Sequence, residues 1–328
     1  MSFMSTLRKI EKANRRAIRA AEKRQRELAK QRKEMAKLAD LEQARFEVDE
    51  YENRIDLIKS VHKECSKVWD WKSIKSSSPP HMPEKTDKHE QLAKSKLASY
   101  KPGLLDKIFN RSEAQVKKLE NNIEIAKKAD QKEHEEQLKQ HKEEYKEWED
   151  TVNVAEKILT GNSEAYLYVL KKLAPFSDIS ELGSSLSFKI RNQQLMEIDL
   201  SVHSDTVIPQ EVKSLTQVGK LSTKKMPKSL YYELYQDYVC GCVLRVAREI
   251  FAILPLEKVI INALGETLNK STGHIEEKII LSVLIPRNTI DSLNFDSIDC
   301  SDAMSNFIYN MKFKKTQGFE VVEKLEVN

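Results

Sequence analysis

The 328-residue chain contains little glycine and proline, with eight and nine residues respectively, and aromatic residues make up only 7% of it. Between Met1 and Lys101 there is no glycine, and the only prolines are Pro79, Pro80 and Pro83. Glycine and proline are the residues that fit a helix interior least well. Their scarcity, together with abundant alanine, glutamate, lysine and leucine, predicts long helices.

Cysteine is also scarce, and the four residues Cys65, Cys240, Cys242 and Cys300 form no Cys-x-x-Cys pair. This spacing argues against zinc ribbons and thioredoxin-like redox sites. We therefore expect buried free thiols, which are typical of a reducing cytoplasm.

No long uncharged run is present. The longest apolar-rich stretch, residues 239–256, is interrupted by three charged residues, whereas a membrane span needs about 18 apolar residues. The start of the chain runs into Arg8 and Lys9 without an apolar signal region. We therefore expect no membrane span and a cytoplasmic protein.

Common catalytic and phosphate-binding motifs are absent. There is no Gly-x-x-x-x-Gly-Lys, Gly-x-Gly-x-x-Gly, His-Glu-x-x-His or Gly-x-Ser-x-Gly pattern. The net charge of +4 is small beside 55 basic and 51 acidic residues, so only local clusters can indicate a nucleic-acid partner. The first 40 residues form one such cluster, because they carry 13 basic and 5 acidic side chains.

Two apolar stripes at helical spacing stand out. The first, which lies in the first predicted helix, consists of Leu41, Ala44, Val48, Tyr51, Ile55 and Ile58. The second consists of Leu138, Tyr145, Val152 and Leu159, with Trp148 and Ala155 between them. Apolar residues at such spacing, surrounded by charged residues, need a partner helix.

These stripes predict a helix over residues 5–66 and a second over 104–161, joined by a Pro- and Ser-containing linker with a short helix near 88–100. The simplest arrangement is a long antiparallel coiled-coil hairpin. Self-association, or a coiled coil with another protein, is the alternative. The expected division is residues 1–72, 73–103, 104–161 and 162–328.

Beyond Gly161 the sequence predicts a small mixed-sheet α/β domain, so that the fold class is α+β. We expect one helix over 163–174, a second over 229–254 and a third near 302–309. Strands are expected at 185–190, 196–202, 207–215, 258–263, 278–285 and 319–322 because apolar residues alternate or cluster there.

One constellation in this domain could carry chemistry. Asp199 lies on the polar face of the second predicted strand, and Glu211 and Lys213 share one face of the third. Carboxylate oxygens are the ligands that Mg²⁺ prefers. The alternatives are ordinary exposed charges on a strand, or a metal site of Glu197, Asp199 and His203.

An acid on one strand and acid-x-Lys on the next resemble the core of the PD-(D/E)XK nucleases, which are restriction-endonuclease-like in fold. This resemblance implies that Asp199 and Glu211 bind Mg²⁺ and that Lys213 is the catalytic lysine. It also implies a metal-dependent nuclease, conceivable in a defence system. Residue 198 is isoleucine, so the Pro-Asp half of the pattern is missing.

A lysine cluster follows the third predicted strand and contains no acid: Lys220, Lys224, Lys225 and Lys228. Such clusters suit the phosphate backbone of DNA or RNA, which is bound electrostatically. The alternative is a solvated loop.

The segments 207–213, 224–228 and 235–240 also resemble a bacterial family that pairs a charged coiled coil with a C-terminal α/β domain. That resemblance implies the architecture but no activity. We therefore expect a cytoplasmic interaction or assembly protein with a nucleic-acid or protein partner, or alternatively the nuclease.

Overall fold

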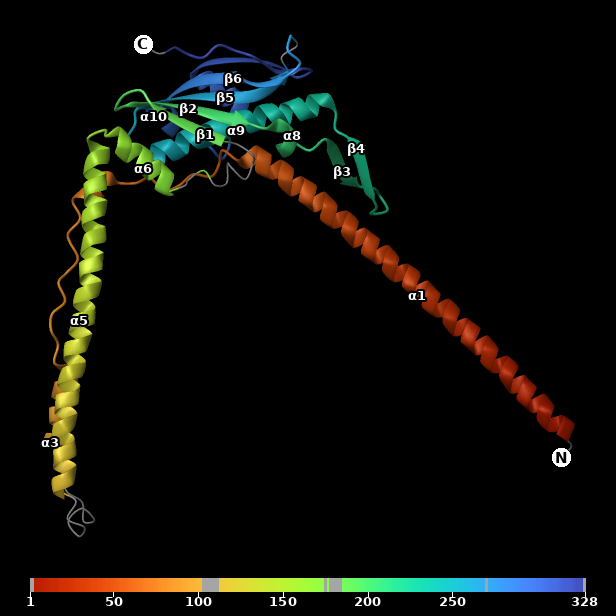
Figure 1. The fold of residues 1–328 in the computed structure, drawn as a ribbon. Coiled ribbons are helices and arrows are strands. Elements are labelled where there is room, and N and C mark those ends of the chain that lie inside the picture. Colours follow the sequence, from red (N-terminus) through yellow and green to blue (C-terminus); the bar gives the residue numbers. More distant parts are fainter. Residues whose placement is uncertain (1–2, 102–111, 174–175, 177–184, 269–270, 327–328) are drawn as a thin grey trace. The chain divides into compact units, whose positions relative to one another are not determined.

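The structure is a computed structural model that describes residues 3–101, 112–173, 176, 185–268 and 271–326 (Figure 1). The chain forms two compact units. Unit 1 comprises residues 1–68 and 170–328, and unit 2 comprises residues 69–169. The fold is α+β, as the sequence predicts, with a mixed six-stranded sheet in unit 1.

Unit 1 begins with the long helix α1 (Phe3–Ser60). The first apolar stripe, from Leu41 to Ile58, lies on this helix, and we call it the α1 apolar stripe. It is a packing surface, since Ala44, Val48 and Ile58 are buried. Its partners in unit 1 are the helix α9 (Lys228–Ile253) and the strands β3 (Glu211–Leu215) and β4 (Leu221–Lys225). The stripe therefore meets a β-hairpin and a helix of the C-terminal domain. Pairing of the two long helices with each other stays a prediction.

The chain that follows α1 is held by polar side chains of α9. Arg248 donates from Nη1 to the carbonyl oxygens of His62 and Lys63, at 2.6 and 3.0 Å. Glu249, which is fully buried, accepts hydrogen bonds from the backbone N–H of Ser66 at 3.1 and 3.2 Å. The same carboxylate lies 2.9 Å from Nε of Arg245, one turn earlier on α9. α1 is thus anchored along its last third.

The sheet has the strand order β1-β2-β5-β6-β7-β8. Only β2 and β5 are parallel, and α9 lies between these two strands in the chain. The other neighbouring strands run antiparallel. The strands are β1 (Ser185–Ile190), β2 (Leu195–Val202), β5 (Lys258–Leu268), β6 (Ile275–Pro286), β7 (Ile308–Lys314) and β8 (Gly318–Glu320).

Helix α9 covers one face of the sheet (Figure 1). The apolar residues of β2 that alternate along the strand, such as Met196, Ile198 and Leu200, are fully buried. The middle of α9 is buried all round, from Tyr238 to Ala247. Burial of apolar surface stabilises a fold by about 25 cal/mol per Å², so this layer stabilises unit 1.

The other face of the sheet carries a polar row. Asp199, Asn262 and Ser282 are register partners on β2, β5 and β6. Residues 321–326, which we call the C-terminal strap, lie across this row. The backbone N–H of Leu325 donates to Ser282 Oγ at 3.0 Å, and Lys324 pairs with the buried Glu197. The strap therefore satisfies polar groups that burial would otherwise penalise.

The predicted strand at 207–215 is wrong in its first half. The segment begins with a short helix, α8 (Ser204–Val207), and β3 begins only at Glu211. β3 pairs with β4 as a separate two-stranded sheet and is no part of the six-stranded sheet. The restriction-endonuclease-like arrangement, which needs this strand inside the main sheet, finds no support.

The remaining short helices of unit 1 follow β6. They are α10 (Arg287–Asp291), α11 (Cys300–Ala303) and the 3₁₀ helix η1 (Met304–Asn306). The predicted helix at 302–309 thus ends earlier, since β7 begins at Ile308. Helix α6 (Ser163–Leu173) contains the boundary between the two units.

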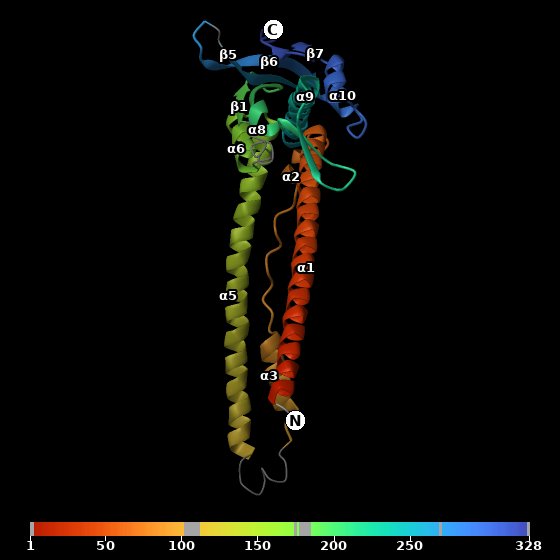
Figure 2. The ribbon, with the colours of Figure 1, turned by 90° about the vertical axis from the view of Figure 1, so that its right-hand side faces the viewer.

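Unit 2 is built on α5 (Ser112–Leu159), with α2 (Trp71–Lys75) and α3 (Lys88–Ala98) against it. In Figures 1 and 2, α3 lies beside the first half of α5. The extended segment between α2 and α3 also contacts α5, because Trp148 Nε1 donates to the Ser77 carbonyl at 3.3 Å and His141 Nε2 lies 3.2 Å from the Pro80 carbonyl. The predicted linker is thus a packed part of unit 2.

The second apolar stripe is covered unevenly by these segments. Ala155 is fully buried, and Leu138, Trp148 and Val152 are partly buried. Tyr145 remains 41% exposed. The stripe thus has partners in the chain just before it, and no second long helix is needed to explain its burial.

Asp130 joins α3 to α5 and gives a testable prediction. Its buried carboxylate accepts the backbone N–H groups of His89 and Glu90, at 3.0 and 2.8 Å. Both groups lie in the first turn of α3, which has no side-chain hydrogen bond from its own N-cap residue. Asp130→Ala should therefore cost about 1 kcal/mol, the usual price of a lost helix cap.

Hydrogen exchange is the measurement for this variant. Amides of residues 88–98 should lose protection, because an isolated helix of this length is marginal in water. Asp150→Ala is the control, since Asp150 is exposed on the same helix. Equal protection of α3 in both variants would contradict the capping role.

None of the helices in the described ranges combines the length and apolar character that a membrane span requires.

Candidate functional site

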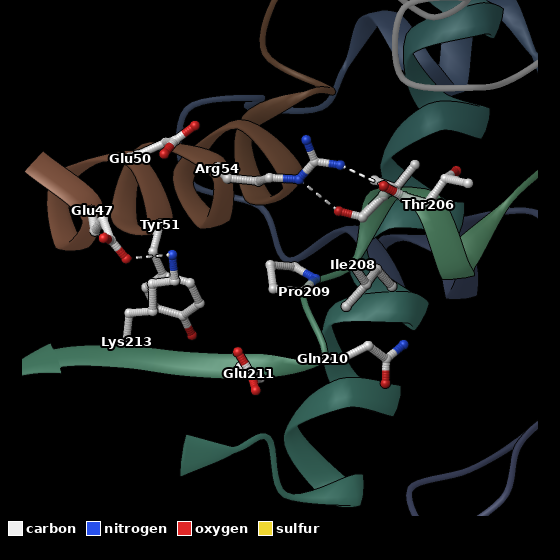
Figure 3. Close-up of a pocket in the computed structure, with 11 residues that line it drawn as sticks. Glu47, Glu50, Tyr51, Arg54, Thr206, Ile208, Pro209, Gln210, Glu211 and Lys213 are labelled. Carbon is white, nitrogen blue, oxygen red and sulfur yellow. Dashed lines mark hydrogen bonds and ion pairs between the residues drawn. The ribbon is translucent and has the colours of Figure 1, made fainter. Parts of the chain in front are cut away.

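A cleft lies in unit 1, between α1 and the segment that leads into β3 (Figure 3). It has a volume of about 550 Å³. Its walls are α1 from Glu47 to Arg54 and residues 206–213. Two of the predicted site residues, Glu211 and Lys213, line it, but Asp199 does not.

Arg54 forms one end of the cleft and fixes its shape. Its Nε donates to the carbonyl oxygen of Val207 at 2.9 Å, and its Nη2 donates to that of Thr206 at 2.7 Å. These carbonyl groups end the short helix α8. The guanidinium group therefore holds the chain before β3 against α1. Its positive charge interacts with the dipoles of these two carbonyl groups.

Lys213 forms the other end of the cleft. Its Nζ lies 3.0 Å from Oε2 of Glu47, as Figure 3 shows. The hydrogen bond from Lys213 lowers the pKa of Glu47. The side chains of Lys213 and Glu47 are 30% and 29% exposed. Lys213 is thus engaged with a carboxylate of α1, and this contact joins residues that are far apart in sequence.

The remaining charged groups of the cleft are carboxylates. Glu50 and Glu211 line it together with Glu47, against the two cations Arg54 and Lys213. Both cations are already hydrogen-bonded to the protein. The cleft therefore suits a cation or a hydrogen-bond donor better than a phosphate.

The predicted metal ligands belong to different sheets. Asp199 lies in the six-stranded sheet and Glu211 in the two-stranded one, and no hydrogen bond or ion pair of the described residues links them. Asp199 Oδ1 instead accepts a hydrogen bond from Asn262 Nδ2 at 2.8 Å. Two carboxylates must share a metal to activate water in this type of enzyme. The Mg²⁺ site of Asp199 and Glu211, with Lys213 as catalytic lysine, thus rests on the resemblance alone.

The second metal hypothesis places His203 beside Glu197 and Asp199. In the structure, His203 Nδ1 lies 3.0 Å from Glu266 Oε1. Glu197 is occupied by Lys324 and by Arg191, whose Nε donates to it at 2.6 Å. Although burial raises the pKa of Glu197, hydrogen bonds from these two cations hold it below its usual value. These residues form a satisfied ion-pair network.

One cluster of three metal-ligand types occurs in the described part of the chain: His89, Asp130 and Glu133 of unit 2. Both oxygens of Asp130 already accept backbone N–H groups. His89 Nε2 lies 3.4 Å from Glu133. A capping role explains Asp130 without an ion.

All four residues of the lysine cluster are exposed, and within the described residues they form no ion pair: Lys220, Lys224, Lys225 and Lys228. Lys224 pairs with Val212 and Lys225 with Glu211 across the hairpin. Successive residues of a strand point to opposite faces, so Lys224 and Lys225 lie on the two faces of the hairpin. Lys220, Lys224 and Lys225 thus lie on the hairpin and Lys228 begins α9, so the cluster presents exposed cations in several directions.

The polar row is the feature that sequence reasoning missed. Asn262 and Ser282 are fully buried, and Ser282 Oγ donates to Asn262 Oδ1 at 2.7 Å. Each interrupts an apolar strand in the sequence, in Val259–Ala263 and in Ile279–Ile285. A lone polar residue at the centre of an apolar strand is the signal that could have indicated it.

Comparison with known proteins adds no relative: the chain matches no protein-family model, no curated protein and no solved structure.

Proposed function

We propose that this protein is a cytoplasmic interaction and assembly protein whose C-terminal α+β domain binds a partner, with nucleic acid as the favoured partner. The observation that carries the proposal is the combination of an anchored helix and free cations in unit 1. α1 is fixed to α9, β3 and β4 along its last third, while residues 27–40 are exposed on all sides. Three lysines of the cluster, Lys220, Lys224 and Lys225, lie on the hairpin that contacts this helix, and within the described residues they form no ion pair.

Electrostatic binding fits these features better than chemistry in the cleft does. A solvated lysine gains free energy when it displaces counterions from a phosphate backbone. Lys213 and Arg54, in contrast, would first have to leave their protein partners. We therefore assign binding of the partner to the exposed lysines and a structural role to the cleft.

The experiment that tests the proposal replaces three lysines of the cluster together, in the variant Lys220→Gln/Lys224→Gln/Lys225→Gln. Binding of a labelled DNA or RNA duplex is measured by fluorescence anisotropy over a series of salt concentrations. If all three contact phosphates, the slope of log K against log[salt] should fall in magnitude by about 2.7, at about 0.9 per contact.

The matched control removes the same charge from unit 2, in Lys117→Gln/Lys118→Gln/Lys128→Gln. These lysines are exposed on α5. The slope of this variant should equal that of the native protein. Equal slopes for the hairpin variant and the native protein would refute the contribution of the cluster, and absence of native binding would refute the nucleic-acid partner.

Assembly through helices is the second part of the proposal, either as an antiparallel coiled-coil hairpin or by self-association. Sedimentation equilibrium over a range of protein concentrations separates a monomer from a self-associating chain. A monomer at all concentrations would limit the assembly role to contacts with other proteins.

The alternative, a Mg²⁺-dependent nuclease of the PD-(D/E)XK type, receives no support from the arrangement of its residues. Its test is direct: cleavage of DNA that needs Mg²⁺ and is lost in Lys213→Ala would replace the present proposal.

A further inference from the structure

One side of helix α1 carries a continuous stripe of residues that are basic in its first part and apolar in its second part. Beginning at Lys9 and stepping by alternating three and four residues, each of nine positions as far as Lys37 holds a lysine or arginine. Four residues after Lys37 the α1 apolar stripe begins with Leu41 and keeps the same alternation to Ile58. We call the first part the basic stripe. Such a spacing keeps residues on one side of a helix.

Beyond the domain, the basic stripe continues along the same side of α1 that packs against the domain. At 100° per residue, Lys30, Lys33 and Lys37 fall in the same sector of about 80° as Leu41, Ala44 and Val48. Ala44 and Val48 are buried in the contact with the domain, whereas the three lysines beyond it are exposed. None of these lysines forms an ion pair within the described residues.

The β3–β4 hairpin meets α1 where the basic stripe ends. Gly219, in the turn of the hairpin, lies so close to α1 that a Cβ atom there would be 3.3 Å from Leu41 Cδ2. Lys220 is the next residue and is exposed. Figure 1 shows the hairpin close to α1, which extends beyond it. The lysine cluster, most of which lies on the hairpin, therefore adjoins the end of the basic stripe.

We propose that the basic stripe of α1 is a track for the phosphate backbone of nucleic acid, continuous with the lysine cluster. From Lys9 to Lys37 it covers about 42 Å of helix at about 1.5 Å per residue. A cation at every third or fourth residue on one side matches a linear array of charges, as a phosphate backbone provides. The inference rests on the proposed nucleic-acid partner and locates most of the binding in α1.

An anionic membrane surface is the competing partner, because basic amphipathic helices also bind lipid headgroups. Such helices insert an apolar face that is rich in Trp, Phe and Leu. The opposite side of α1 is poor in such residues: it presents Leu28, Met35 and Leu38 as exposed apolar residues, with Gln31 between them. The sparse apolar side favours nucleic acid.

The test uses the full chain with the variant Lys30→Gln/Lys33→Gln/Lys37→Gln. Glutamine is nearly as good a helix former as lysine, so α1 should stay helical, which circular dichroism checks. Binding of a duplex at about 0.1 M salt should weaken by roughly tenfold or more, and the salt slope should fall by about 2.7. The α5 control variant Lys117→Gln/Lys118→Gln/Lys128→Gln should keep native values.

The outcomes separate this inference from the proposed function. If the hairpin variant weakens binding and the stripe variant does not, the basic stripe is not a track and the proposed function stands. If the stripe variant alone weakens binding, the track is supported and the lysine cluster loses its role. Native protein that binds phosphatidylserine vesicles but neither duplex DNA nor duplex RNA overturns the track and the nucleic-acid partner together.

Discussion

Replacing Glu249 with alanine is expected to lower the free energy of unfolding by about 3–5 kcal/mol, the usual loss when one partner of a buried ion pair is removed. Glu249 is fully buried on α9, and Arg245 beside it is only 6% exposed. The variant would leave the buried guanidinium group beside Glu64, a more exposed carboxylate, at 3.2 Å. It would also leave the Ser66 N–H without its acceptor. Urea unfolding followed by circular dichroism measures the loss.

The matched control removes both charges, in Arg245→Met/Glu249→Leu. Apolar residues of similar volume often replace a buried ion pair without loss of stability. We therefore expect the double variant to be more stable than Glu249→Ala by at least about 2 kcal/mol. If the single variant unfolds at the same urea concentration as the native protein, the ion pair does not anchor the chain after α1.

Replacing Asp237 with asparagine is expected to stabilise the protein above about pH 6 and to leave it nearly unchanged at pH 4. Burial, then the nearby charges of Asp299 and Glu233, raise the pKa of Asp237 from 3.8 to about 6. The folded protein therefore binds this proton more tightly than the unfolded chain does. Stability from this group is present below pH 3.8, falls as the pH rises toward about 6, and stays lost above it.

Asparagine removes this dependence because it does not titrate. The difference in unfolding free energy between variant and native protein should grow through that window and reach about 1–2 kcal/mol, after allowance for solvent screening of a partly exposed group. Thermal unfolding at several pH values measures it. Glu233→Gln is the companion variant, since removal of a neighbouring charge should move the window to lower pH. A constant difference at all pH values would contradict the raised pKa.

Regular periodicity explains the parts of the fold that the sequence predicts well. Strand β1 has the predicted bounds, 185–190, and α9 differs from its prediction by one residue at each end. The first half of the predicted strand 207–215 is wrong because Val207 ends the helix α8 and Ile208 follows it, and both are buried there and not in a strand. Buried positions are apolar in helices and in strands alike, so a short apolar run does not distinguish a helix from a strand.

The partner of an apolar stripe is harder to predict than the stripe itself. Spacing identified Ala44 and Val48 as packing residues, but their partners lie at 211–225 and in α9. The same holds for Lys213, which pairs with Glu47, 166 residues earlier in the chain. Nothing in local spacing encodes such contacts, because they depend on how separate elements dock. The candidate cleft, whose two walls come from these elements, was therefore beyond sequence reasoning.

The division of the chain into units has a consequence for synthesis. Unit 2 is one continuous segment of the chain, whereas unit 1 consists of two segments, one before and one after unit 2 in the sequence. As the polypeptide leaves the ribosome, α5 and its neighbours can fold while the β-hairpin that will cover Ala44 and Val48 does not yet exist. Until then the α1 apolar stripe is exposed to chaperones and to neighbouring nascent chains. The polar row of the sheet is covered only after Lys324 and Leu325 have been synthesised.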